Sequence, residues 1–321
     1  MSIDADEFTA RLKAERNDPA REERLRQDRR KRRRTIGIWA GAGVVLAGGF
    51  TFWLVDVTSG ERPAEEPFAA GALNEALWPD SWPATTSSPF RGSPASGWDK
   101  ADEDWGMPLP PVHPVDGLGE EQVTSGLGVV RDFLRETNVS DEVLLGEVPE
   151  KALALLAPDD PARTGLETAV AHPTEGRSPL EAFTRFDPEE VLVLGGVRDQ
   201  GSMTYEAAPG GGLLVHADYT FVYAVTKPED GWEVVPGRPE AARVVVRRRL
   251  TATVREGKLL LGPAGHVIAN TACPGPDDGF IHPLFYKERA KVKGGKEFDP
   301  YADGATFPEA SAGVCLRPTR T

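Results

Sequence analysis

An uncharged run of 21 residues, Thr35–Val55, constrains this 321-residue chain more than any other feature. As an α-helix the run would be about 31 Å long, which matches a bilayer hydrocarbon core of about 30 Å. Trp39 lies near its start, and Phe52 and Trp53 lie near its end, at the two depths where aromatic rings are favoured. We therefore expect residues 35–55 to form one transmembrane helix that acts as a signal-anchor.

Charges on either side of the run predict its orientation. Six consecutive cations precede it: Arg29, Arg30, Lys31, Arg32, Arg33 and Arg34. Acidic residues follow it, so the positive-inside rule places residues 1–34 in the cytoplasm and the rest outside. Two alternatives compete. A cleaved signal peptide would need a better cleavage site than residues 55–58, and a buried core helix would be destabilised by the five glycines of the run.

Residues next to and within the span predict two interactions. The six cations would attract anionic lipid headgroups, at about 1 kcal/mol per basic residue. Gly37 and Gly41 have the small-xxx-small spacing that lets two helices approach closely, so self-association through this face is a candidate.

The formal net charge of −13 is unevenly distributed. Residues 1–34 hold twelve Lys/Arg and eight Asp/Glu, a balance of +4, so the remaining residues carry −17. Phosphate contacts need clustered cations, and we therefore predict no nucleic-acid partner.

The two cysteines, Cys273 and Cys315, suit one disulfide outside the cytoplasm. The bond would close a loop of 43 residues and stabilise the fold by about 4 kcal/mol. Two unpaired buried thiols are the alternative.

Residues 56–115 have a linker composition, with ten prolines and many small residues. They also hold four of the seven tryptophans: Trp78, Trp82, Trp98 and Trp105. An inert spacer rarely carries so many large apolar side chains. We expect these rings to dock on the folded domain, to lie at the membrane surface or to bind a partner.

Residues 116–321 are expected to form one extracytoplasmic α+β domain. Val123, Leu127, Val130 and Leu134 mark one face of a helix over residues 120–137. Short helical segments are expected after Ser140, over 149–156 and over 180–186. The period then changes to two, which predicts strands over 191–194, 213–226, 242–255 and 258–261. Helices followed by hairpin-linked strands indicate an antiparallel sheet packed on helices.

This order of elements resembles the NTF2-like α+β cone. The layout of basic tail, single span, linker and such a domain is similar to bitopic assembly subunits of type IV secretion machines. It also resembles envelope proteins of high-GC bacteria. The resemblance implies a curved sheet that encloses a cavity, and a role in protein assembly. It covers the element order of residues 120–270 only, so it assigns no residue a role.

Sequence motifs for catalysis are absent. No G-x-S-x-G elbow or phosphate-binding Gly-rich loop occurs, and the five histidines have no metal-ligand spacing. His216 and Asp218 share a strand face and could do acid–base work, but without a nucleophile or a third group we interpret them as a polar sheet surface. Residues 299–304 resemble part of a calcium loop, although Glu309 is one place short of the bidentate position, so a polar turn is the alternative. We predict no catalytic residue, no metal and no cofactor.

Arg248 is a cation on an otherwise apolar strand face. Its stem could extend to solvent at the sheet edge, or its head could bind an acidic group in the cone. Our leading hypothesis is a membrane-anchored protein whose outer domain binds other envelope proteins. The rival is a small-ligand binder or enzyme that uses Arg248, Tyr219 and Tyr223. A regulator that signals through the short tail is the third option.

Overall fold

The computed structural model describes residues 83–103, 106–228, 233–235, 238–289, 295–302 and 316–321. The predicted cytoplasmic tail, the predicted span 35–55 and the first part of the predicted linker lie outside these residues. Among the described residues, no helix is both long and apolar enough to cross a membrane. The membrane topology therefore stays a prediction.

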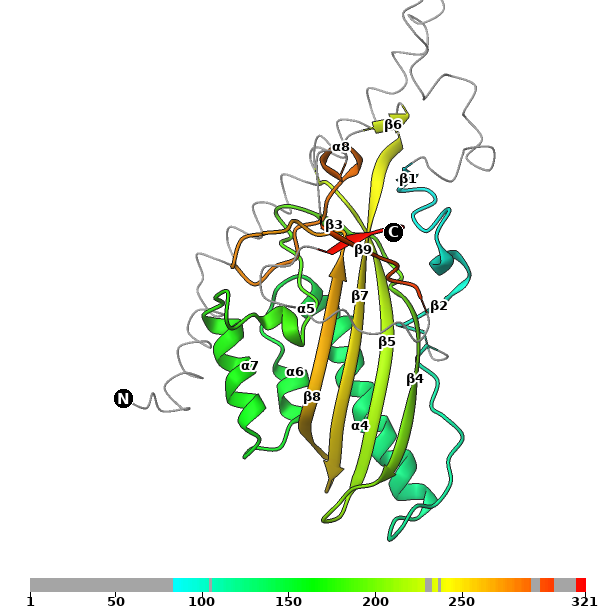
Figure 1. Cartoon of the computed structure of the whole chain (residues 1–321), viewed down its shortest axis with the longest axis vertical. Coiled ribbons are helices and arrows are strands. Elements are labelled where there is room, and N and C mark those ends of the chain that lie inside the picture. Colours follow the sequence, from blue (N-terminus) through cyan, green and yellow to red (C-terminus); the bar gives the residue numbers. More distant parts are fainter. Residues whose placement is uncertain (1–82, 104–105, 229–232, 236–237, 290–294, 303–315) are drawn as a thin grey trace, which may run out of the picture. The chain divides into compact units, whose positions relative to one another are not determined.

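The described chain folds into an α+β unit built on one strongly curled antiparallel sheet (Figure 1). Its four long strands lie in the order β4 (Arg198–Ala207), β5 (Leu213–Thr226), β7 (Arg238–Arg255) and β8 (Lys258–Ala269). Short strands extend it: β1 (Ala84–Thr85) and β6 (Glu233–Val235) pair with β7, β2 (Asp99–Lys100) with β4, and β3 (Leu192–Val193) with β5. Strands β9 (Lys296–Phe298) and β10 (Leu316–Pro318) form a separate parallel pair.

Helices follow one another along the chain before the long strands. They are α4 (Glu120–Asn138), α5 (Asp141–Leu144), α6 (Glu150–Leu155) and α7 (Pro161–Ala171), followed by a 3-10 turn η4 (Pro179–Glu181). A second 3-10 turn, η3 (Pro94–Gly97), and a short helix α8 (Tyr286–Arg289) lie outside this group. Helix α4 lies behind the sheet, and α6 and α7 stand beside β8 (Figure 1). The predicted α+β class with an antiparallel sheet is confirmed.

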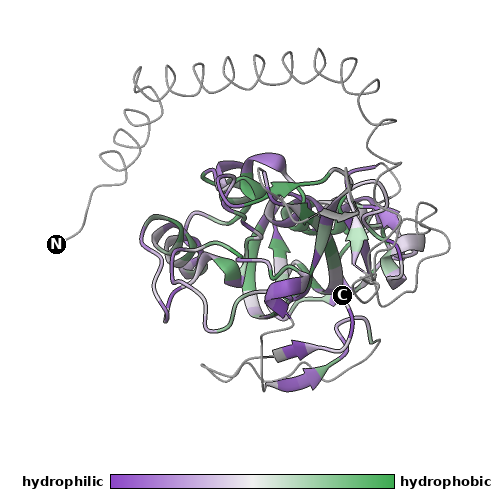
Figure 2. Ribbon diagram, turned by 90° about the horizontal axis from the view of Figure 1, so that it is seen from above, coloured by the Kyte–Doolittle hydropathy of each residue, from purple (hydrophilic) through white to green (hydrophobic). Residues whose placement is uncertain are grey.

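Helix α4 fills the concave face of the sheet. The predicted stripe Val123, Leu127, Val130 and Leu134 is buried against the long strands. Gly126 makes this approach possible, because a Cβ there would lie 2.8 Å from Leu213 Cδ2. Seen along the strands, hydrophobic residues gather in the interior that sheet and helices enclose (Figure 2).

Large aromatic side chains occupy most of that interior. Tyr219, Tyr223, Phe183, Phe186 and Phe221 are among the largest fully buried residues. Phe186 meets Tyr223 edge to face, with ring centroids 5.5 Å apart. The centre of the curled sheet is therefore packed with side chains.

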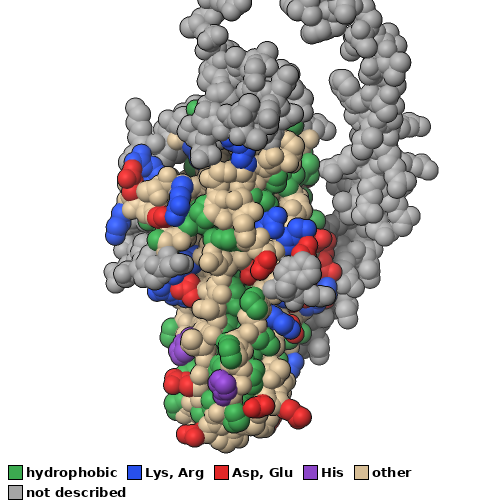
Figure 3. Space-filling view, turned by 90° about the vertical axis from the view of Figure 1, so that its right-hand side faces the viewer, with side chains coloured by type: hydrophobic (Ala, Val, Ile, Leu, Met, Phe, Trp, Pro, Cys, Tyr) green, Lys and Arg blue, Asp and Glu red, His purple; other side chains and the backbone are tan. Residues whose placement is uncertain are grey.

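One end of the convex face carries a second, smaller core. Phe90 and Tyr301, from segments near the two ends of the described chain, cover Val222 and Val245 of the sheet. Trp98 packs on the same cluster and meets Tyr301 edge to face at 5.5 Å. Seen from the side at the right of Figure 1, where β4 lies, the described surface shows mainly uncharged atoms with scattered charged side chains (Figure 3).

The compact unit includes residues that the sequence analysis assigned to the linker. Strands β1 and β2 come from this segment, and Met107 is fully buried in the main core. Trp98 docks on the folded domain, which is one of the three predicted roles of the linker tryptophans. Trp78, Trp82 and Trp105 lie outside the described residues.

Candidate functional site

Arg248 projects from the concave face of β7 into the packed interior, and it is only 4% exposed. Its Nε donates to Asn138 Oδ1 at 3.0 Å, and its Nη2 donates to Thr184 Oγ1 at 3.2 Å. Its Nη1 donates to the carbonyl oxygens of Leu180 and Glu181 at 2.6 and 3.0 Å. The guanidinium therefore does not extend to solvent at the sheet edge, which was one of its two predicted positions.

The acceptors of Arg248 are themselves held in place by α4 and β5. Asn138, the last residue of α4, donates from Nδ2 to the Leu134 carbonyl oxygen at 3.1 Å. The Thr184 hydroxyl donates to Asn138 Oδ1 at 2.9 Å, and the Tyr223 hydroxyl donates to the Asn138 carbonyl oxygen at 2.7 Å. We call Arg248, Asn138, Thr184 and Tyr223 the Arg248 network. It locks the end of α4 to the sheet.

Every acceptor of Arg248 is electrically neutral. No carboxylate of the described residues forms an ion pair with this guanidinium. Burial lowers the pKa of Arg248 to about 10, and the nearby Tyr223 hydroxyl opposes this shift. The side chain stays protonated at neutral pH. Burial and the Arg248 charge together lower the pKa of its cross-strand neighbour His266 to about 4.

The structure brings two of the three predicted ligand-binding residues together. Tyr223 belongs to the Arg248 network, whereas the Tyr219 hydroxyl does not, although Tyr219 lies opposite Arg248 in the strand register. The Tyr219 ring packs over Gly201, where a Cβ would lie 2.5 Å from it. Its buried hydroxyl has no hydrogen-bond partner in the described chain. Burial and the neighbouring Asp199 raise the pKa of Tyr219 to about 12.

A pocket of about 270 Å³ opens beside Arg248, and we call it the Arg248 pocket. Helices α4 and α7, the segment 176–182 and strands β7 and β8 form its walls. Its apolar lining residues are Phe133, Leu134, Ala162, Leu166, Ala169, Ala182, Leu250, Leu261 and Ala264. Its charged lining residues are Arg177, Glu181, Arg248 and Arg249. The pocket thus combines an apolar wall with an excess of cations.

A second, open depression of about 490 Å³ lies where α4 ends, and we call it the α4–β3 groove. Its apolar lining residues are Val139, Leu144, Leu145, Val193, Leu194 and Val197. Its charged lining residues are Asp102, Arg135, Glu136 and Asp141. Leu145 is 44% exposed and nearby Val148 is 36% exposed, and both belong to the few large apolar side chains that the described chain exposes.

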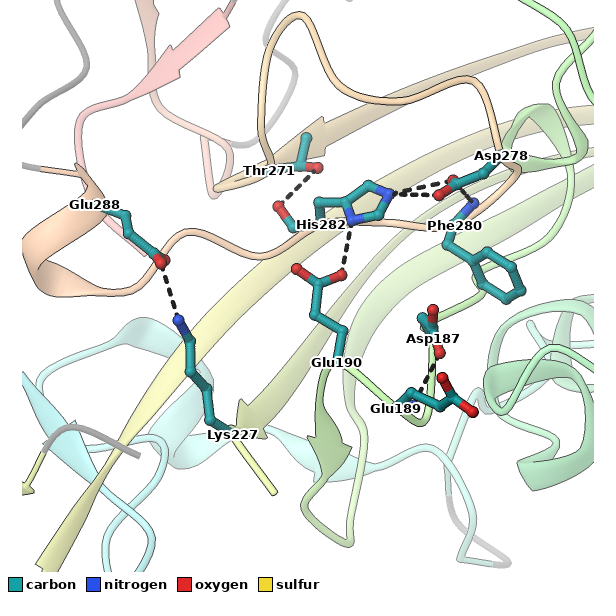
Figure 4. Close-up of polar contacts among 9 residues, drawn as sticks. All are labelled: Asp187, Glu189, Glu190, Lys227, Thr271, Asp278, Phe280, His282 and Glu288. Atoms are coloured by element: carbon teal, nitrogen blue, oxygen red, sulfur yellow. Dashed lines mark hydrogen bonds and ion pairs between the residues drawn. The ribbon is translucent and has the colours of Figure 1, made fainter. Parts of the chain in front are cut away.

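His282 lies between two carboxylates in the segment that follows β8 (Figure 4). Its Nδ1 is 2.7 Å from Glu190 Oε2, and its Nε2 is 3.1 Å from both carboxylate oxygens of Asp278. Burial lowers the pKa of His282, but the hydrogen bonds to Asp278 and Glu190 outweigh burial and raise it. The ring therefore fastens this segment to residues just before β3.

His216 and Asp218 have different partners and do not form a proton-exchange pair. His216 Nδ1 lies 3.1 Å from Thr251 Oγ1, whereas Asp218 accepts hydrogen bonds from two arginines. Arg247 binds both carboxylate oxygens at 2.9 and 2.8 Å, and Arg249 Nε lies 2.9 Å from Oδ2. These arginines lower the pKa of Asp218 against the effect of its partial burial, so the carboxylate is a poor general base.

The described residues contain no group of three His, Cys, Asp or Glu side chains arranged to hold a metal ion. Asp299, the first residue of the calcium-like stretch, begins a turn and is paired with Arg320 at 2.7 Å, while residues 303–315 lie outside the described chain. Cys273 is disulfide-bonded. Its predicted partner Cys315 lies outside the described residues, so this pairing stays a prediction.

Sequence reasoning singled out Arg248 but missed what surrounds it. Asn138 and Thr184 are 110 and 64 residues away along the chain, and neither belongs to a motif. Helix α7, which forms one wall of the pocket, was not predicted either. Its signal was the dipeptide Asp160-Pro161, since the Asp160 side chain caps the helix by accepting from Ala162 N.

Comparisons of this chain with protein-family models, with curated proteins and with solved structures find no match.

Proposed function

We propose that the domain is a binding module that holds a segment of another protein in the α4–β3 groove. The observation that carries this proposal is the exposure of Leu145, which lines the groove, and of Val148, three residues further along the chain. Exposed apolar side chains that border a concave, partly apolar surface are typical of interaction sites. Val139, Val193 and Leu194 would supply the apolar floor against which such a segment packs.

Charges around the groove favour a basic partner. Asp102, Glu136 and Asp141 face only one cation, Arg135, among the lining residues. The Arg135 Nη2 donates to the neutral Asp102 carbonyl oxygen at 3.2 Å, and the three carboxylates outnumber its charge, so the rim is acidic. We therefore propose an apolar segment flanked by Lys or Arg, because complementary charge speeds association and excludes wrong partners.

The groove would lie outside the cytoplasm, and the helix predicted over residues 35–55 would anchor this protein in the membrane. We also propose an NTF2-like classification for the fold. The long helix α4, the short helices after it and the curled sheet β4–β5–β7–β8 support it. The packed interior differs from an open cone, which is why the proposed partner sits at the end of α4 and not inside the sheet.

Site-specific photocrosslinking tests this proposal with the full-length protein in its native cells. A photoreactive benzophenone amino acid would replace Leu145 in one sample. In the control it would replace Thr204, which is exposed on the convex face. We expect a light-dependent adduct with a different protein at residue 145 and none at residue 204. Mass spectrometry should find the crosslink in an apolar stretch next to basic residues.

A charge reversal sharpens the same experiment. Asp141→Lys removes acidity at the groove and should weaken the adduct several-fold. Glu121→Lys makes the same change in the first turn of α4, outside the groove lining, and should leave the adduct unchanged. Equal crosslinking from residues 145 and 204, or an adduct made only of a second copy of this chain, would contradict the proposal.

A further inference from the structure

The Arg248 pocket contains a buried positive charge that the described protein leaves without a counter-ion. A guanidinium carries five N–H donors. Four of them are used by Asn138, Leu180, Glu181 and Thr184, which leaves one Nη2 hydrogen without an acceptor among the described residues. Four neutral acceptors satisfy the geometry of the group, but they do not neutralise its charge.

The rim of the pocket adds further positive charge. Arg177 lines the pocket, is exposed, and has no side-chain partner in the described chain. Arg249 also lines it, although its Nε pairs with Asp218 on the convex side of the strand. Glu181 is the one acidic residue of the lining, so three cations face one anion. The pocket lining is therefore positively charged, although the chain as a whole has a net charge of −13.

The rest of the pocket lining is mainly apolar, with Thr137, Asn138 and Ser178 as its uncharged polar side chains. Leu134, Leu166 and Leu261 approach from three different elements, and they offer a surface to an apolar body. Gly165 of α7 faces open space, because a Cβ built there meets no atom within 4 Å. A volume of about 270 Å³ corresponds to roughly nine water molecules, the size of a small organic molecule and not of a lone ion.

From these features we infer that the Arg248 pocket binds a small amphipathic carboxylate. Its carboxylate would accept the remaining Nη2 hydrogen of Arg248 and face Arg177 at the rim. Its apolar body, of the length of a medium-chain acyl group, would lie between Leu134, Leu166 and Leu261. This site is separate from the α4–β3 groove and shares no lining residue with it, so either assignment can fail without the other.

Calorimetric titration of the full-length, detergent-solubilised protein with sodium octanoate tests the inference. We expect saturable binding with a Kd on the order of 0.1 mM, which the small size of the ligand permits. Octan-1-ol carries the same apolar body without the charge, and inorganic phosphate carries charge without the body. Each should bind at least tenfold more weakly than octanoate.

A variant designed to block the pocket gives the decisive test. Gly165→Phe adds a ring at a lining residue of the pocket, where a Cβ meets no atom within 4 Å, and it leaves the residues of the Arg248 network unchanged. It also replaces glycine in a helix, so folding should be preserved. The matched control is Gly128→Phe on α4, where a Cβ also meets open space and which lies outside the pocket lining. Uptake of octanoate by detergent is the same in both samples and cancels in their difference.

The inference holds if Gly165→Phe weakens octanoate binding at least tenfold while Gly128→Phe does not. It also requires that Arg177→Ser weakens binding several-fold, since the rim cation faces the carboxylate. Equal binding by the two phenylalanine variants, octanol binding as tight as octanoate binding, or no saturable binding to the wild type overturns it.

Discussion

Arg247 and Arg248 are adjacent on strand β7, but they lie on opposite faces of the sheet and their charges have different surroundings. Arg247, on the convex face, forms a two-point ion pair with Asp218, which is itself partly exposed. Arg248, on the concave face, is buried among neutral acceptors and lies beside an apolar pocket. The Asp218 side chain is 34% exposed, so water reaches the first ion pair and reduces its contribution to stability. The second charge acts in a medium of low dielectric, where each of its partners matters more.

The largest expected loss of stability comes from removing the Arg248 charge. Arg248→Met leaves the carbonyl oxygens of Leu180 and Glu181 buried without a donor, at about 1 to 3 kcal/mol each. Relief of the charge burial offsets part of this cost. We therefore expect a net loss of about 3 kcal/mol in the free energy of unfolding, measured by urea denaturation.

The matched change on the other face is Arg247→Met. Water can reach the partly exposed Asp218 carboxylate once its partner is removed, so we expect a smaller loss, of about 1 kcal/mol. If both variants lost the same stability, the distinction between the two faces of β7 would be wrong.

The pKa shifts of two aspartates, Asp199 on the concave face and Asp218 on the convex face, also have opposite signs. Burial raises the pKa of Asp199, on the concave face of β4, to about 6. The native state therefore binds a proton more readily than the unfolded state between about pH 4 and pH 6. The contribution of Asp199 to stability is then present below this window and is lost as the pH rises through it. Asp218 behaves in the opposite sense, because its arginine partners lower its pKa.

Asp199→Asn should remove this dependence. Subtracting the unfolding free energy of Asp199→Asn from that of the wild type gives a difference that should fall by about 2 kcal/mol between pH 4 and pH 7. Asp218→Asn should give a difference of the opposite slope at the acidic end, where protonation breaks the ion pairs. Urea denaturation at stepped pH measures both. A flat difference curve for Asp199→Asn would contradict the assigned burial effect.

The contrast between the faces also explains what the sequence could predict. Strand β5 has apolar residues at every inward position, those of β7 are mainly apolar, and α4 carries an unbroken apolar stripe, so all three were predicted. Strand β4 was missed because its inward positions include Asp199 and Gly201 beside Met203, which hides the period of two. Arg248 was visible as the one cation on an apolar face, whereas its acceptors come from loops and helix ends that no periodicity marks.

Removing the hydroxyl groups of two tyrosines on the concave face should change the stability less, and in opposite directions. Tyr223→Phe removes the hydrogen bond to the Asn138 carbonyl oxygen and should cost about 1 to 2 kcal/mol. Tyr219→Phe removes a buried hydroxyl that has no partner in the described chain, so stability should stay the same or rise by up to about 1 kcal/mol. Paired urea denaturation curves measure both, and a loss at Tyr219 equal to that at Tyr223 would reveal an unrecognised partner.

The smallest effect links the buried charge of Arg248 to ligand binding. Burial and the field of Arg248 hold the pKa of His266 near 4, so the imidazole is neutral at physiological pH. A carboxylate bound beside Arg248 would cancel part of that field, and the pKa of His266 should then rise by a fraction of a unit. Its ring-proton shifts in an NMR pH titration, with and without octanoate, would measure this rise. His216, on the convex face and away from the pocket, supplies the internal control and should not respond. If octanoate binds but the His266 titration stays unchanged, the ligand does not sit next to the guanidinium, because an anion in contact with Arg248 must alter the potential at its cross-strand neighbour.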